Sequence, residues 1–162
     1  MTKEGGSSLG EKMYVKAGDR ATYSRTISEG DVYLFGGVTG DLSKTHTNEA
    51  YMRERSQYGK RIAHGALIVG LMSAASTASI AHIVDRDDLT EFPTSLGYDR
   101  IRFLKPVFLN DTVTVTYEVV TVDEERRRTV AQVEARNERD ELVAVAHHIM
   151  KWSPVTRAAG AA

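Results

Sequence analysis

Residues 61–84, "RIAHGALIVGLMSAASTASIAHIV", hold the longest apolar run of the 162-residue chain and decide its fold. The run predicts one long helix over residues 65–84, which begins after a histidine–glycine pair. Glycine, alanine and serine keep much of this helix thin, so it can lie very close to a sheet. A helix that is apolar nearly all round is usually buried. Because His64, His82 and several serines interrupt the run, we interpret it as the buried helix of a soluble protein, not as a membrane span.

The chain after Pro93 has the period of strands. In "DTVTVTYEVVTVD", residues 111–123, valines and a tyrosine alternate with threonines, which is a period of two. Three further strand-like stretches are "TSLGYDRIRFLKPV", "RRTVAQVEARN" and "ELVAVAHHIMKW". Helices first and then at least four strands with short connections predict an antiparallel sheet with one long helix, an α+β fold.

Upstream of the long helix the signals are local. "RATYSRTIS" alternates as a short strand does. Ser28 followed by Asp31 predicts a helix start, and this helix ends at Gly40. Asn48 can cap a second short helix that ends at Gly59. The segment 84–96 is too irregular to assign.

The chain length suits one domain. We predict a flexible N-terminal segment at residues 1–12, a single domain at 13–153 and a flexible tail at 154–162, because both ends are rich in small and polar residues.

Composition excludes several classes of protein. The 21 basic and 22 acidic residues give no sign of nucleic-acid binding. Cysteine is absent, which excludes disulfides and a cysteine nucleophile. The absence of cysteine also fits a reducing compartment, so we expect a cytoplasmic protein. We expect no membrane partner. The N-terminus has no apolar core and does not resemble a secretory signal. Nucleotide-loop and serine-hydrolase motifs are missing, and the histidines lack metal-ligand spacing, so we expect no metal.

An acid and a histidine five residues apart, Asp41 and His46, lie in "GDLSKTHTNEAYM", residues 40–52. A histidine can both take and give a proton near neutral pH, and a nearby carboxylate can share a water with it. The alternative is a capping loop in which Asp41 bonds backbone amides and His46 is exposed surface. Spacing alone does not decide between them, and the capping loop is the more common case.

His64 and Gly65 form a second candidate site at the start of the long helix. The first turn of a helix has unpaired N–H groups, which can hold an oxygen that gains negative charge. Gly65 would let a ligand carbonyl approach the backbone closely. The alternative is a glycine retained for packing. Hydroxyls inside the helix, such as Ser73, usually bond back to a carbonyl one turn earlier.

Three stretches together resemble a known family: "FGGVTGDLSKTH", "YGKRIAHGALIVGLMS" and "FLKPVFLNDTVTVTYEV". They are similar to the MaoC-like dehydratases, the (R)-specific enoyl-CoA hydratases of hot-dog fold. The resemblance covers roughly residues 20–152, and three motifs in the same order are more specific than any one alone. It implies a hot-dog fold, an antiparallel sheet wrapped around a long central helix.

The resemblance also implies roles for individual residues. Asp41 and His46 match the family's acid and histidine that bind the catalytic water, and Gly65 matches the glycine whose N–H meets the thioester carbonyl. Ser73 matches a small hydroxyl residue near the active site, and we expect His64 to bind substrate beside it. The implied partners are an acyl-CoA thioester and a second copy of the chain, in a homodimer or dimer-based oligomer. No cofactor is expected, since CoA is part of the substrate.

One departure from the family pattern concerns the loop between the acid and the histidine. The family reads Asp-x-Asn-Pro-x-His, whereas Ser43 and Lys44 stand here in place of Asn-Pro. Loss of proline predicts a more mobile loop. Lys44 is a candidate for contact with a carboxylate on the acyl group or with a CoA phosphate, and plain solvent exposure is its alternative.

Together these features predict a hydro-lyase that reversibly adds water to a trans-2-enoyl-CoA to give an (R)-3-hydroxyacyl-CoA. Two other functions fit the same fold: an acyl-CoA thioesterase and a non-catalytic acyl-CoA-binding subunit.

Overall fold

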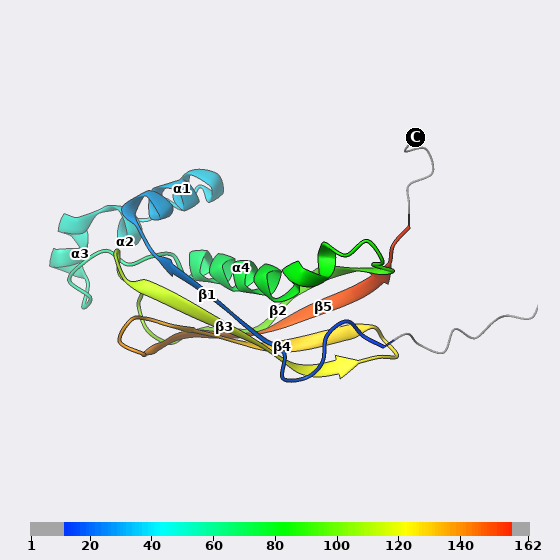
Figure 1. The fold of residues 1–162 in the computed structure, drawn as a ribbon. Coiled ribbons are helices and arrows are strands. Elements are labelled where there is room, and N and C mark those ends of the chain that lie inside the picture. Colours follow the sequence, from blue (N-terminus) through cyan, green and yellow to red (C-terminus); the bar gives the residue numbers. More distant parts are fainter. Residues whose placement is uncertain (1–11, 157–162) are drawn as a thin grey trace, which may run out of the picture.

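The computed structural model describes residues 12–156, and in this range a five-stranded antiparallel sheet packs across one long helix, α4 (Gly65–Val84) (Figure 1). The α+β arrangement and the bounds of the long helix are as predicted. The predicted flexible segments fall almost entirely outside the described residues. The last strand continues to Pro154, one residue past the expected end of the domain.

The sheet has the order β1-β3-β4-β5-β2, and every neighbouring pair is antiparallel. Its strands are β1 (Arg20–Thr26), β2 (Glu91–Phe103), β3 (Thr112–Asp123), β4 (Arg128–Arg136) and β5 (Leu142–Pro154). Strands β1 and β2 are therefore the two edges. Strand β2 departs from regular pairing with β5 at two places, between Ser95 and Gly97 and between Asp99 and Arg102. Such irregularities bend a strand and increase its twist.

Burial along β3 confirms the predicted alternation. Its inward residues, each at most 4 % exposed, are Val113, Val115, Tyr117 and Val119. The residues between them are half-buried on the opposite face. This face of the sheet buries its apolar side chains against α4, and burial of each such side chain stabilises the fold by roughly 1.5–3 kcal/mol.

Helix α4 is buried on one side only. Its buried residues are Ile68, Leu71, Met72, Ala75, Ser76 and Ile83. The other side is exposed and carries Ala66, Gly70, Ser73 and Thr77. The expectation that this helix is buried on nearly all sides is therefore wrong for the single chain. By length and a mean hydropathy of 1.8, α4 would also pass as a membrane span, with 33 % of that window buried, but core helices of soluble proteins pass the same test.

Helix α1 (Glu29–Thr39) begins and ends as predicted. The Ser28 hydroxyl accepts from the Asp31 N–H at 3.1 Å, and the Asp31 carboxylate accepts from the Ser28 N–H at 2.8 Å, which is a capping box. Gly40 closes the helix at φ 81°, a left-handed conformation that glycine adopts without strain.

Two short helices follow. Helix α2 (Lys44–Thr47) was not predicted, and Ser43 is its N-cap. Helix α3 (Glu49–Arg55) is capped by Asn48 as expected, since the Asn48 side chain accepts from the Tyr51 N–H at 2.8 Å. It ends at Arg55, before Gly59.

A buried histidine lies in the sheet beneath α4. His148 is 0 % exposed, and its Nδ1 and Nε2 lie 2.8 Å from the Tyr117 hydroxyl and 2.7 Å from the Ser95 hydroxyl. The Tyr98 ring stacks on it with centroids 4.5 Å apart. Burial lowers the pKa of His148 to about 4 and raises that of Tyr117 above its ordinary value. Both ring nitrogens have partners, so we interpret the cluster as structural.

His148 makes stability depend on pH. Its pKa is about 4 when folded and near 6.5 when unfolded, so the unfolded chain binds the proton first. This stability is fully present above pH 6.5 and is lost as pH falls toward 4. We expect the free energy of unfolding to fall by roughly 2 kcal/mol between pH 7.5 and pH 5 from this group.

Urea unfolding at the two pH values checks this expectation. A His148→Gln variant should show a smaller pH dependence, whereas His147→Gln, a change of the half-buried neighbour, should retain it. An equal pH dependence in both variants would contradict the assignment.

Candidate active site

The loop that carries Asp41 turns back against the end of α1. The Leu42 N–H donates to the Gly40 carbonyl at 3.0 Å, and the Asp41 N–H donates to the Thr39 hydroxyl at 3.2 Å. A Cβ on Gly36 would lie 2.9 Å from Leu42 Cδ2 and 3.1 Å from the Asp41 carbonyl oxygen. Glycine at position 36 therefore permits this close return, because a side chain there would force Leu42 and the Asp41 backbone to shift.

Ser43 stiffens the loop in a local way. Its N–H donates to Asp41 Oδ1 at 3.3 Å, and its hydroxyl accepts from the Thr45 N–H at 3.4 Å as the N-cap of α2. Asx-type bonds and caps of this kind hold turns without proline. These two bonds of Ser43 constrain the loop at the position where the family has Asn-Pro. Lys44, which lies between Ser43 and Thr45, is exposed.

His46 lies in α2, and one of its ring nitrogens is hydrogen-bonded to the backbone. Its Nδ1 is 2.8 Å from the Ile62 carbonyl oxygen. A carbonyl can only accept, so Nδ1 carries the proton of the neutral ring and Nε2 has a free lone pair. Among the described hydrogen bonds none involves Nε2 of His46. The half-buried ring is thus prepared to accept a proton at Nε2.

The His64 ring contacts the His46 ring and is buried, with 2 % of the residue exposed. The two rings stack with centroids 3.7 Å apart and an interplanar angle of 30°. His64 Nε2 is 2.9 Å from the Asp41 carbonyl oxygen and 3.9 Å from Asp41 Oδ2. The structure therefore brings together Asp41, His46 and His64, which are separated by up to 23 positions in sequence.

These three side chains are also a possible set of metal ligands. One ligand atom from each lies within 4.8 Å of the others, and carboxylate and imidazole are common ligands of zinc. His64 would have to give up its bond to Asp41 and move its proton to Nδ1, which is buried and has no partner. An unpaired buried N–H is unfavourable, so the geometry fits a held water better than a metal.

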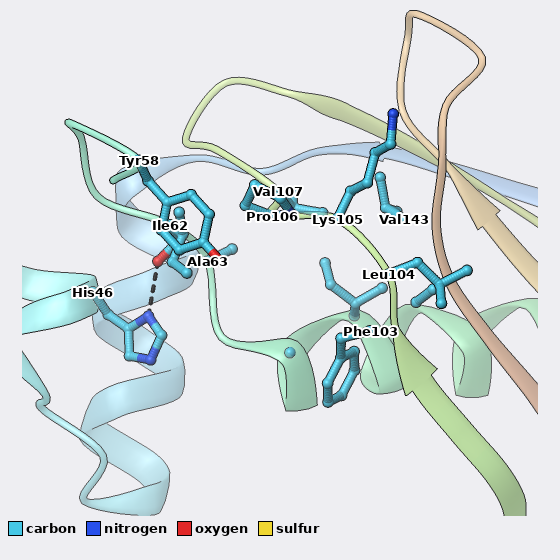
Figure 2. Close-up of a pocket in the computed structure, with 13 residues that line it drawn as sticks. His46, Tyr58, Ile62, Ala63, Phe103, Leu104, Lys105, Pro106, Val107 and Val143 are labelled. Atoms are coloured by element: carbon cyan, nitrogen blue, oxygen red, sulfur yellow. Dashed lines mark hydrogen bonds between the residues drawn. The ribbon is translucent and has the colours of Figure 1, made fainter. Parts of the chain in front are cut away.

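Beside His46 is a mostly apolar pocket of about 230 Å³. Its lining residues are His46, Tyr58, Ile62, Ala63, Gly65, Ile68, Phe103, Leu104, Lys105, Pro106, Val107, Val143 and Ala144. Figure 2 shows His46 on one side, bonded to Ile62, and Phe103 beside the start of α4. The pocket thus places a free imidazole nitrogen next to an apolar space and a helix N-terminus.

Gly65 lines this pocket, and the Phe103 ring packs closely against it. A Cβ at this position would lie 2.7 Å from two ring carbons of Phe103. The preceding N-cap residue, His64, makes no side-chain cap bond to α4. The first-turn N–H groups of α4 therefore have no capping side chain, which suits the predicted contact with a carbonyl oxygen.

Four predicted site residues do not line the pocket: Asp41, Lys44, His64 and Ser73. Ser73 is exposed on α4 and Lys44 is exposed on α2, where its ammonium is 5.4 Å from the centroid of the Tyr51 ring. His64 also does not line the pocket, because the ring is covered by His46 and by Phe35, whose centroid is 4.8 Å away. Substrate contact by Ser73, Lys44 and His64 stays a prediction that this geometry does not favour.

Phe103 and Tyr58 also line the pocket, and neither was predicted from the sequence as a site residue. Phe103 stands in the quoted motif "FLKPV", and an aromatic residue at the end of a strand was the available signal. Tyr58 is the first residue of the quoted motif "YGKRIAHGALIVGLMS", but it precedes the long helix and has no periodic pattern of its own. Ile62, which holds His46, acts through its backbone carbonyl, so its side-chain type carries no signal.

The arrangement of sheet, helix and loop is that of the hot-dog fold. The chain superposes on the unliganded (R)-hydratase PhaJ1 of Pseudomonas aeruginosa with a TM-score of 0.69 at 29 % identity, covering 89 % of this chain and 88 % of that one.

The sequence comparisons define the family. The model of the MaoC like domain matches residues 14–142, so the chain belongs to the MaoC-like domain family. An (R)-specific enoyl-CoA hydratase of Rhodospirillum rubrum is 32 % identical over 114 residues, which cover 70 % of this chain and 72 % of that protein. A 3-hydroxybutyryl-CoA dehydratase of Methylorubrum extorquens is 32 % identical over 105 residues, which cover 64 % of this chain and 60 % of that protein.

Two adjacent glycines of α1 provide a test of the loop geometry. A Cβ on Gly37 meets nothing within 4 Å, so Gly37→Ala should stabilise the protein by up to ~1 kcal/mol through helix propensity. Gly36→Ala should lose this gain and destabilise by about 1–3 kcal/mol, because the added methyl crowds Leu42 and the Asp41 carbonyl. Denaturant unfolding of both variants measures the difference, and equal stabilities would contradict the close return of the loop.

Proposed function

We propose that this protein is a hydro-lyase that reversibly adds water to a trans-2-enoyl-CoA and forms an (R)-3-hydroxyacyl-CoA. One observation carries the proposal: a ring nitrogen of His46 and a carboxylate oxygen of Asp41 lie within 4.8 Å of each other, and both His46 and Gly65 at the start of α4 line an apolar pocket. Stereochemistry and the CoA carrier follow from the names of the similar hydratase and dehydratase.

The tautomer of His46 gives the two residues different roles in this proposal. Nε2 accepts a proton from a water that the Asp41 carboxylate orients through the other O–H. The water oxygen forms the new bond to C3 as its O–H bond breaks. The proton held on Nε2 then passes to C2, and His46 returns to its neutral form. Dehydration is the same sequence in reverse.

The thioester oxygen gains negative charge when C3 is attacked. We assign its stabilisation to the Gly65 N–H at the positive end of α4. Loss of one such donor typically lowers kcat by about 10²–10³-fold, which corresponds to roughly 3–4 kcal/mol. No redox change accompanies the addition of water, so we propose no cofactor.

A homodimer and a cytoplasmic location complete the proposal. Edge strand β2 exposes large apolar side chains, with Phe92 at 55 % and Leu96 at 50 %. An exposed apolar edge strand is a template for pairing with another chain, and the exposed side of α4 supplies further surface to cover. Lys44 and Ser73 contact substrate in this proposal only if the dimer brings a second chain to them.

Substitution of the two central residues tests the reaction. We expect Asp41→Asn and His46→Gln each to lower kcat on crotonyl-CoA by roughly 10²–10⁴-fold, because each removes a group that handles the proton. Loss of the conjugated enoyl thioester absorbance measures turnover, and chiral analysis of the product gives its configuration. Asp87→Asn and His82→Gln, the same changes on exposed side chains elsewhere, serve as matched controls.

Other outcomes would favour the alternative functions. Release of free CoA with hydration absent indicates a thioesterase. Thermal stabilisation by acyl-CoA without turnover across a panel of enoyl-CoAs indicates a binding subunit. Full activity in both Asp41→Asn and His46→Gln would overturn the site assignment.

The assembly can be tested independently of activity. Light scattering after gel filtration should give twice the chain mass of 17.9 kDa. Leu96→Asp on the edge strand should shift the population toward the single chain, whereas Val38→Asp, a change of an 87 % exposed residue on α1, should not. A monomer for the unmodified protein would contradict the dimer.

A further inference from the structure

We propose that His64 is a positioning residue, which fixes Asp41 and His46 relative to each other and does not itself contact substrate. The inference rests on the hydratase activity proposed above. His64 bonds the backbone of Asp41 through Nε2, at 2.9 Å, and stacks on the ring of His46, at 3.7 Å between centroids. Among the described residues no other side chain is hydrogen-bonded to, or in ring contact with, both Asp41 and His46.

The hydrogen bond to Asp41 identifies which ring nitrogen of His64 carries a proton. Its acceptor is the Asp41 carbonyl oxygen, so Nε2 carries the proton. Nδ1 is buried without a hydrogen-bond partner. His64 is thus the donor that holds the Asp41 backbone, whereas Nε2 of His46 has no hydrogen-bond partner among the described residues.

Burial keeps water away from the hydrogen bond between His64 and the Asp41 carbonyl, which we call the tether. The His64 side chain is 2 % exposed, because Phe35 covers one part of the ring and His46 another. Asp41 is exposed by comparison, with 52 % of its side chain accessible. The most solvent-exposed member of the site is therefore held at its backbone by the most buried one.

His64 also affects the start of α4, because it directly precedes Gly65 in the sequence. It is the N-cap residue of α4, where serine, threonine, aspartate or asparagine would cap the first-turn N–H groups. The His64 side chain makes no such bond, since a cap needs an acceptor and Nδ1, the acceptor nitrogen of the ring, has no hydrogen-bond partner. The Leu67 N–H donates to the His64 carbonyl at 3.1 Å, and the His64 side chain does not cap the N–H of Gly65. One residue therefore organises the acid–base pair and leaves the oxyanion donor free.

Three substitutions separate the parts of this role. His64→Gln retains a side-chain N–H donor at a similar reach. His64→Phe retains an aromatic ring for the stack and loses the donor. His64→Ala loses both. His82→Gln on the exposed side of the same helix is the matched control for the chemical change.

We expect His64→Ala to lower kcat about 10²-fold with a nearly unchanged KM, since small misplacement of reacting groups has effects of this size. His64→Gln should recover most of the rate, and His64→Phe should resemble His64→Ala if the donor is the main contribution. A KM increase at constant kcat would overturn the proposal in favour of direct substrate binding, and so would full activity of His64→Ala.

Hydrogen exchange of the free protein tests the tether without any substrate. Amides of residues 41–47 should exchange faster in His64→Ala and His64→Phe than in the unmodified protein, and His64→Gln should retain protection. Unchanged exchange in all variants would overturn the tether. If the unmodified protein hydrates no enoyl-CoA, the proposed function fails, and the exchange result still decides whether His64 holds the loop.

Discussion

Two hydrogen bonds join the loop of Asp41 and His46 to the short segment that leads into α4. His46 donates to the Ile62 carbonyl, and His64 donates to the Asp41 carbonyl. The same segment is bonded to the chain after β2, because the Ala63 N–H donates to the Val107 carbonyl at 2.7 Å. The Asp41–His46 pair, the helix start and the pocket wall are therefore held by the same segment.

Sequence patterns predicted the elements whose determinants are local. The capping box of Ser28 and Asp31 and the αL glycine at position 40 define α1 within the helix itself. The alternation in β3 predicted its buried face because that face is decided by period two. The candidate pair Asp41 and His46 was also found from spacing, but only the resemblance to a family favoured chemistry over a capping loop.

Other features depend on contacts that no local pattern encodes. Helix α2 has four residues, which is too short for a periodic signal. The start of β2 at Glu91 was not assigned, because Pro93 and two irregular pairings interrupt its pattern. The bond from His64 to Asp41 crosses 23 positions. Gly65 was predicted to admit a carbonyl, whereas its close neighbour in the structure is the Phe103 ring.

The exposed character of the Asp41 loop has a consequence for how the protein loses activity on heating. Residues 40–44 are all exposed, and the loop is held mainly by hydrogen bonds rather than by buried apolar side chains. The sheet beneath is held by a continuous apolar core. Segments with few buried contacts open at lower free energy than the core. The temperature at which turnover stops should therefore lie below the temperature at which the sheet unfolds, so inactivation and denaturation are two separate transitions in this molecule.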